Sequence, residues 1–78
     1  MEVEYAEYLL NTFPRSELES LDEFGYGWLH STVFNNDLPI ARILLANDFD
    51  KNIKSGRGET PKDIAIRLNR TEFIELFE

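Results

Sequence analysis

The 78-residue chain contains no cysteine, a single histidine and a single tryptophan. Without cysteine it can form no disulfide and present no thiol nucleophile, and one imidazole cannot build a soft-ligand zinc cluster. No basic segment precedes an apolar one at the N-terminus, and no apolar run approaches the roughly 18 residues that span a bilayer. We therefore expect a cytoplasmic, intracellular protein with no membrane segment, cofactor or metal.

Positive charge is scarce in the first third of the chain. Residues 1–24 carry seven acidic side chains against Arg15 alone, so they hold −6 of the total charge of −7. Residues 48–78 are nearly balanced at −1 and hold six of the eight basic side chains. Such polarity commonly just keeps a small protein in solution, and it can also steer a basic partner toward the acidic end. Direct nucleic-acid binding by the basic residues is disfavoured by the overall charge.

A chain of this length forms one domain, and the spacing of its apolar residues predicts an all-α fold. Six helices are expected, over residues 2–11, about 16–21, 28–35, 38–46, 61–68 and 71–78. Ser16 and Asp37 are predicted N-caps, and Thr60 with Asp63 forms a capping-box pattern around Pro61. Residues 51–58 are expected to form a polar, finger-like loop.

Two segments of the chain, residues 25–57 and 58–78, follow one pattern. Equivalent positions in the two segments, such as Gly25 and Gly58, lie 33 residues apart, and we call this fixed separation the period. A period of this size indicates a fold built by stacking like units. Gly25 and Gly27 permit positive φ in the turn before the first copy's helix. Asn36 and Asn69 stand at matching turns, and asparagine adopts the left-handed conformation more readily than most residues.

The two copies resemble the ankyrin repeat. The first reads Gly25-Tyr26-Gly27-Trp28-Leu29-His30-Ser31-Thr32 and ends its second helix with Leu44-Leu45, and the second begins Gly58-Glu59-Thr60-Pro61-Lys62-Asp63-Ile64-Ala65. Tyr8-Leu9-Leu10 is similar to the end of another second helix, but it precedes Leu44-Leu45 by 35 residues rather than by one period of 33. The resemblance implies a helix-turn-helix stack of about two and a half repeats: an N-terminal cap unit over 1–24, a repeat over 25–57 and a C-terminal capping repeat over 58–78.

The resemblance implies a protein-binding scaffold without catalysis, whose variable positions lie on the finger tips and on the first helix of each repeat. The candidate partner-binding residues are Glu23, Phe24, Tyr26, Trp28, Phe34, Asn35, Lys54, Arg57, Glu59 and Arg67. The four aromatic residues among them are expected to cluster at one end of a concave face, where aromatic side chains often dominate binding energy. The alternative is that Phe24, Trp28 and Phe34 pack the junction with the N-terminal unit. Phe49, which stands where the ankyrin pattern has a small alanine, is expected to protrude.

No residue set predicts catalysis. The resemblance makes His30 structural, bonded across the turn, and neighbouring Ser31 and Asp37 point in other directions, so no serine-histidine-acid arrangement forms. The expected function is an acidic inhibitor or immunity-type protein that blocks a basic protein partner, such as a nuclease, a toxin or a defence complex. The alternative is an assembly subunit or homodimerising adaptor that uses the same face on itself.

Overall fold

The computed structural model describes residues 2–78, and every regular element within them is a helix. The helices are α1 (Val3–Thr12), α2 (Arg15–Leu18), α3 (Trp28–Phe34), α4 (Leu38–Ala46), α5 (Pro61–Arg67) and α6 (Thr71–Leu76). The predicted all-α class is confirmed. The predicted bounds lie close to the observed ones except at α2, which ends at Leu18 and not near Leu21 as expected.

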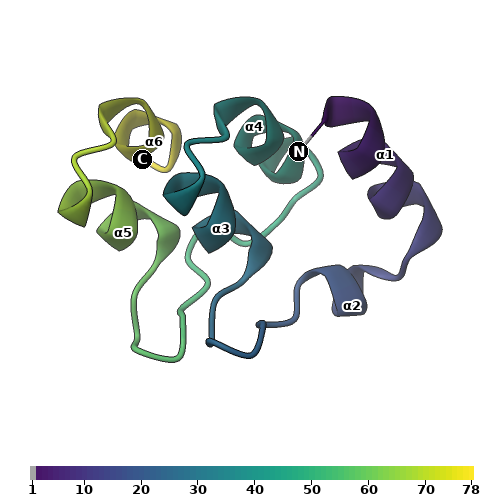
Figure 1. Ribbon diagram of the computed structural model, residues 1–78, viewed down its shortest axis with the longest axis horizontal. Coiled ribbons are helices and arrows are strands. Elements are labelled where there is room, and N and C mark those ends of the chain that lie inside the picture. Colours follow the sequence, from purple (N-terminus) through teal and green to yellow (C-terminus); the bar gives the residue numbers. More distant parts are fainter. Residues whose placement is uncertain (1) are drawn as a thin grey trace.

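The helices form two rows (Figure 1). One row holds α1, α4 and α6, and α4 contacts both of its neighbours. The second row holds α3 and α5, which pack against each other, and each is joined by a short turn to its partner in the first row. The loops that precede α3 and α5 extend side by side away from the helices. The pairs α3–α4 and α5–α6 are therefore hairpins, and the two hairpins stack sideways.

The core lies between the two rows. Every helix except α2 contributes at least one residue to the buried apolar set, which includes Ala6, Leu29, Val33, Ile40, Ala41, Leu44, Ile64, Ala65, Phe73 and Phe77. Because α4 has helices on both sides and a hairpin partner, its residues Ile40, Ala41 and Leu44 are almost completely inaccessible to water. By contrast, α1 buries only Ala6 completely.

Positive φ angles occur at the predicted turns. Asn36 and Asn69 have φ angles of 55° and 57°, as the matching turn positions predict, and Gly25 has a φ of 84°. Gly27, the other glycine of this turn, is extended with a φ of −88°, because it is the N-cap residue that precedes α3. Asp48, in the turn after α4, is also left-handed at 63°, a conformation that was not predicted.

Backbone hydrogen bonds recur with the period of the sequence pattern. The N–H of Asp37 donates to the carbonyl of Thr32, and one period later the N–H of Arg70 donates to the carbonyl of Ala65, both at 2.8 Å. These bonds close the turn from α3 to α4 and the turn from α5 to α6. The two hairpins are therefore held by the same local connections.

The helix starts follow the predicted caps in two of three cases. Thr60 and Asp63 form the expected reciprocal box at the start of α5, and the Asp37 side chain accepts from the N–H of Ile40 at the start of α4. Ser16 is not a cap, because Pro14 is already extended and α2 begins directly after it, which places Ser16 inside the first turn.

Phe49 does not protrude, contrary to the expectation. Its side chain is only 7% exposed, and its ring meets the ring of Trp28 edge-on with centroids 5.9 Å apart. The guanidinium of Arg15 covers the Phe49 ring at 4.7 Å from its centroid. The short α2 lies close enough to the finger to supply this cover, and so the large side chain finds a buried place.

Candidate partner-binding surface

The loop before α3 is organised by one carboxylate. Asp22 Oδ1 accepts hydrogen bonds from the N–H groups of Phe24 and Tyr26, both at 2.9 Å. The backbone N–H of Asp22 donates to the carbonyl of Tyr26, which closes the loop into a narrow turn. Because the short side chain of aspartate can bond to backbone groups just after it, it fixes such turns without help from the core. Phe24 and Tyr26 are thereby held at the tip and the exit of the turn.

The loop before α5 repeats this arrangement with a different residue. Ser55 Oγ accepts from the N–H groups of Arg57 and Glu59, both at 3.2 Å. The acceptor and the two donors stand one period after those of the first loop, which are Asp22, Phe24 and Tyr26. The loops are also joined, because the N–H of Gly56 donates to the carbonyl of Gly25 at 2.8 Å. The two loop tips therefore form one continuous surface.

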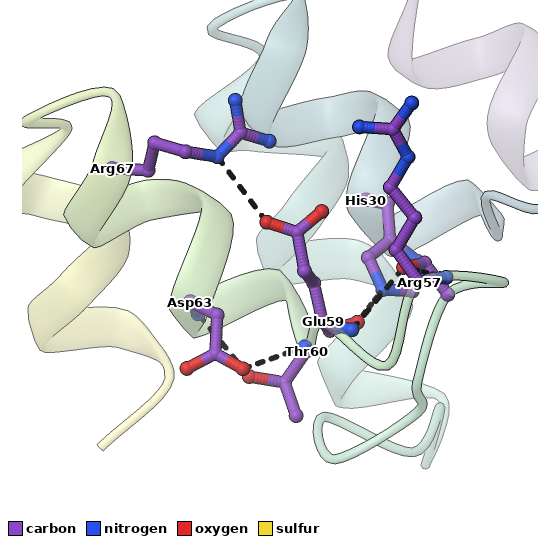
Figure 2. Close-up of polar contacts among 7 residues, drawn as sticks. His30, Arg57, Glu59, Thr60, Asp63 and Arg67 are labelled. Atoms are coloured by element: carbon purple, nitrogen blue, oxygen red, sulfur yellow. Dashed lines mark hydrogen bonds and ion pairs between the residues drawn. The ribbon is translucent and has the colours of Figure 1, made fainter.

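His30 links the two repeating units. Its Nδ1 accepts from the N–H of Gly27 at 3.0 Å, so the proton of the neutral ring is on Nε2, which donates to the carbonyl of Glu59 at 2.8 Å. Figure 2 shows this second bond reaching from α3 to the loop before α5. His30 is fully buried. The imidazole is therefore occupied in holding α3 to the next unit.

Asp63 occupies the matching position in α5, one period after His30. Its Oδ2 accepts from the N–H of Thr60 at 2.9 Å, and its own N–H donates to Thr60 Oγ1 at 3.1 Å (Figure 2). The bonds from Thr60 lower the pKa of the Asp63 carboxyl, with a smaller contribution from the positive charges of Lys54 and Lys62. The carboxylate accepts the same bond from the helix start that the His30 ring accepts in α3.

A hollow of about 460 Å³ opens between α3 and the two loops. We call it the aromatic hollow, and its lining residues are Asp22, Phe24, Tyr26, Ser31, Phe34, Asn35 and Arg57. The rings of Tyr26 and Phe34 meet edge-on with centroids 5.0 Å apart, whereas Phe24 is 74% exposed. Five of the ten candidate residues therefore lie together in this hollow.

Two other candidates form an ion pair at the equivalent place in the second unit. Arg67 Nε lies 3.2 Å from Glu59 Oε2 (Figure 2). Arg67 and Glu59 stand one period after Phe34 and Tyr26. The same gap between loop and helix is thus closed by an aromatic pair in one unit and by an ion pair in the next.

The remaining three candidates lie outside the aromatic hollow. Trp28 is on another side of α3, where it packs against Phe49 at the junction with the N-terminal unit, as the alternative for this residue proposed. Glu23 and Lys54 are exposed in the two loops. Two lining residues, Asp22 and Ser31, were not among the predicted candidates. Asp22 could have been found from the period, which relates it to Ser55.

The charge at the aromatic hollow is mixed. Arg57 lies at its rim, and its guanidinium makes no hydrogen bond or ion pair with another residue of the described part, residues 2–78. Figure 2 shows the Arg57 side chain apart from the Glu59–Arg67 pair. Asp22 contributes a carboxylate whose Oδ1 is already bonded to the loop. The site can therefore offer apolar contact from three rings together with polar groups of both signs.

Two kinds of site are absent from residues 2–78. These residues hold no group of three or more His, Cys, Asp or Glu placed to bind a metal ion. Within the same part of the chain, none of the helices has the length and apolar character that crossing a bilayer would need.

No protein-family model, no curated protein and no solved structure matches the chain.

Proposed function

We propose that the chain is an ankyrin-like repeat protein, with a cap unit over residues 1–24, a repeat over 25–57 and a capping repeat over 58–78. The recurrence of hydrogen bonds and left-handed turns with one period supports this assignment. The packing of α1 on α4 is consistent with α1 being the second helix of an incomplete unit. On this view, the loops before α3 and α5 are the repeat's fingers.

The proposed function is a small, non-catalytic binding module that blocks a protein partner with a basic surface, in the manner of an inhibitor or immunity protein. The aromatic hollow is the observation that carries this proposal. Phe24 is largely exposed at the mouth of the hollow, and the Tyr26–Phe34 pair forms a wall behind it. Tyrosine, tryptophan and arginine are the residues that most often dominate binding energy between proteins, and the hollow holds Tyr26 and Arg57 beside the two phenylalanine rings.

The acidic third of the chain supports the choice of a basic partner. Asp22 lines the aromatic hollow and Glu23 follows it in the same loop, within the segment 1–24 that carries a charge of −6. A field of this sign accelerates association with a basic surface and weakens as salt is added. A nuclease or a toxin that binds an anionic substrate presents such a surface.

The experiment is co-purification of the tagged chain with partners from its native host, repeated with Phe24→Ala and Phe34→Ala. We expect capture of a basic protein, and a loss of affinity of roughly thirtyfold or more for the substitution that removes a dominant contact. Tyr8→Ala is the matched control, since this aromatic side chain on α1 is 56% exposed and does not line the aromatic hollow. A captured partner that is acidic, or binding that does not respond to salt, would contradict the proposal.

The second candidate is an assembly subunit or homodimer. It is favoured by the presence of both an exposed ring, Phe24, and an open hollow on the same surface, because one copy could insert its ring into another. Molar mass in solution separates the two candidates. A dimer whose mass is independent of concentration, and which is lost in Phe24→Ala, would favour assembly over the binding of another protein.

A further inference from the structure

Only one side of α3 is covered by another helix of its own row. His30 faces α5, since its Nε2 donates to Glu59. Trp28 and Thr32 lie on the opposite side, given 100° of rotation per residue. On that side, no helix among residues 2–78 lies beside α3 in the row of α3 and α5 (Figure 1). The N-terminal unit supplies α1 to the other row, and the four-residue α2 lies lower, beside the loops.

The uncovered side carries a second hollow of about 230 Å³. We call it the side hollow, and it is lined by Trp28, Ser31, Thr32, Asn35, Asp37 and Ile40. Thr32 and Ile40 are only 3% and 1% exposed, so they form its floor. Ser31 and Asn35 line both the side hollow and the aromatic hollow. The two hollows therefore meet across the outer ridge of α3.

The surroundings of the side hollow are acidic. Glu19 and Asp50 line a narrow crevice together with Trp28, and Asp37 lines the side hollow itself. The adjoining aromatic hollow holds one charge of each sign, from Asp22 and Arg57. The only base in residues 1–24 is Arg15, whose guanidinium lies over the ring of Phe49. A second copy of the chain carries the same net charge of −7 and is repelled overall. Charge complementarity therefore favours a basic occupant.

We propose, resting on the proposed function, that the side hollow receives a short basic helix of the partner protein. The helix lies in the row of α3 and α5, where the N-terminal unit has none. Its apolar face packs on the half-buried Trp28, and its basic face meets Glu19. Because α3 and α5 each have seven residues, about 10 Å at 1.5 Å per residue, the helix needs about two turns at the contact. Residues next to this helix in the partner reach the aromatic hollow.

The test uses the fluorescence of Trp28, the single tryptophan of the chain, which lines the side hollow. The probe is an amphipathic peptide of leucine and lysine about 18 residues long, above the length at which isolated helices are marginal. The control peptide has glutamate in place of lysine. With the full chain we expect a saturable change in Trp28 emission on adding the lysine peptide, weakened by salt, and no change with the glutamate peptide.

Two matched pairs of variants locate the contact. Asn35→Arg adds bulk and positive charge where the hollows meet, and we expect it to weaken binding of the lysine peptide roughly tenfold or more. Its control is Leu68→Arg, at the equivalent position one period later, which should bind as the unchanged protein does. Glu19→Lys should also weaken binding, whereas Glu75→Lys on α6 should have little effect. Thermal melts confirm that each variant is folded.

Three outcomes distinguish failure of this inference from failure of the proposed function. If calorimetry detects the lysine peptide while Trp28 emission is unchanged and only Phe24→Ala weakens binding, the side hollow is not the site, and the proposed function stands. If calorimetry detects no binding of the lysine peptide, the inference is overturned, and co-purification decides the proposed function alone. If emission changes with the concentration of the protein itself and the molar mass doubles, the occupant is a second copy and the inference is also wrong.

Discussion

Three separate parts of the chain are joined by contacts among the side chains of Arg15, Phe49 and Trp28. The guanidinium of Arg15 in α2 lies over the Phe49 ring, and that ring meets the edge of Trp28 in α3. Phe49 is buried and Trp28 is half-buried, so the contact between the two rings is largely shielded from water. These contacts therefore tie the acidic N-terminal unit to the finger that follows α4.

Replacing Phe49 tests this contact. We expect Phe49→Ala to lower the free energy of unfolding by about 3 kcal/mol, because it removes a buried ring and leaves a cavity. Arg15→Ala should lower it by only about 0.5–1 kcal/mol, the range for a cation over an aromatic face near the surface. Urea unfolding measures both. Phe24→Ala is the control, since its ring is largely exposed; an equal loss for Phe24→Ala and Phe49→Ala would contradict the burial of Phe49.

Gly25 and Gly58 form a second matched pair. Both have positive φ, 84° and 79°, but a Cβ on Gly25 would lie 3.0 Å from the backbone nitrogen of Gly56, whereas a Cβ on Gly58 would have no neighbour within 4 Å. We expect Gly58→Ala to cost about 1 kcal/mol in unfolding free energy, from the left-handed conformation alone. Gly25→Ala should cost at least about twice as much, because the loops must also separate. Equal losses in thermal unfolding would show that the loop contact is not limiting.

Single residues were predictable where their conformation depends on near neighbours. The left-handed Asn36 and Asn69 and the box of Thr60 with Asp63 could be assigned because each depends on a few consecutive residues. The burial of Phe49 could not, since the side chain that covers it, Arg15, comes from a distant part of the sequence.

At the scale of the helix, the capping box of α5 predicts a dependence on pH. The bonds from Thr60 hold the pKa of Asp63 below its ordinary range in the folded protein. A carboxyl whose pKa is lowered by folding stabilises the fold above its unfolded pKa, and this contribution disappears as the pH falls through the folded value. Asp63→Ala should therefore be less stable than the unchanged protein at neutral pH, and this difference should shrink on acidification. Urea unfolding across that range measures it, and a difference that stays constant would contradict the prediction.

The helix α1 has a structural role that truncation can test. It packs on α4, buries Ala6 and keeps Leu9 and Leu10 partly covered. About three stacked units are usually needed to form a continuous core, and residues 2–78 hold two hairpins with α1 packed on α4. We expect deletion of residues 1–10 to abolish cooperative thermal unfolding rather than merely lower its midpoint. A truncated chain that still melted cooperatively would show that α1 is dispensable.

The positions of the helices were easier to predict than the grouping of side chains at the candidate surface. Five of the six helices follow from apolar spacing and caps, because both signals are local. The aromatic hollow was predicted in part: Phe24, Tyr26 and Phe34 gather there, but Trp28 does not. Trp28 and Phe34 stand at opposite ends of α3 and on different sides of it, so the predicted grouping of all four aromatic residues did not follow from the predicted helix.

At the scale of the whole molecule, charge is distributed along the stack. Residues 1–24 form the end with α1 and α2 and hold most of the negative charge, whereas α5 and α6 at the other end belong to a nearly balanced segment. A basic partner should therefore approach the N-terminal end first, before any specific contact is made.

Two variants of equal net charge test this orientation. Glu4→Lys with Glu7→Lys reverses charge on α1 at the N-terminal end, away from both hollows, and Glu72→Lys with Glu75→Lys does the same on α6. We expect the first pair to slow association with the lysine peptide clearly more than the second, and added salt to reduce the difference. Stopped-flow measurement of Trp28 fluorescence gives the rates. Equal rates for the two variants would mean that only the total charge matters.

The first unit has an aromatic pair, Tyr26 and Phe34, where the second unit has an ion pair, Glu59 and Arg67. The two pairs occupy equivalent positions, while the residues that hold each unit together, such as His30 and Asp63, lie elsewhere. The exposed chemistry of one unit can therefore be rewritten without disturbing its backbone. If the proposed function holds, substitutions at these few positions change what the surface binds, while the backbone of the two hairpins stays the same.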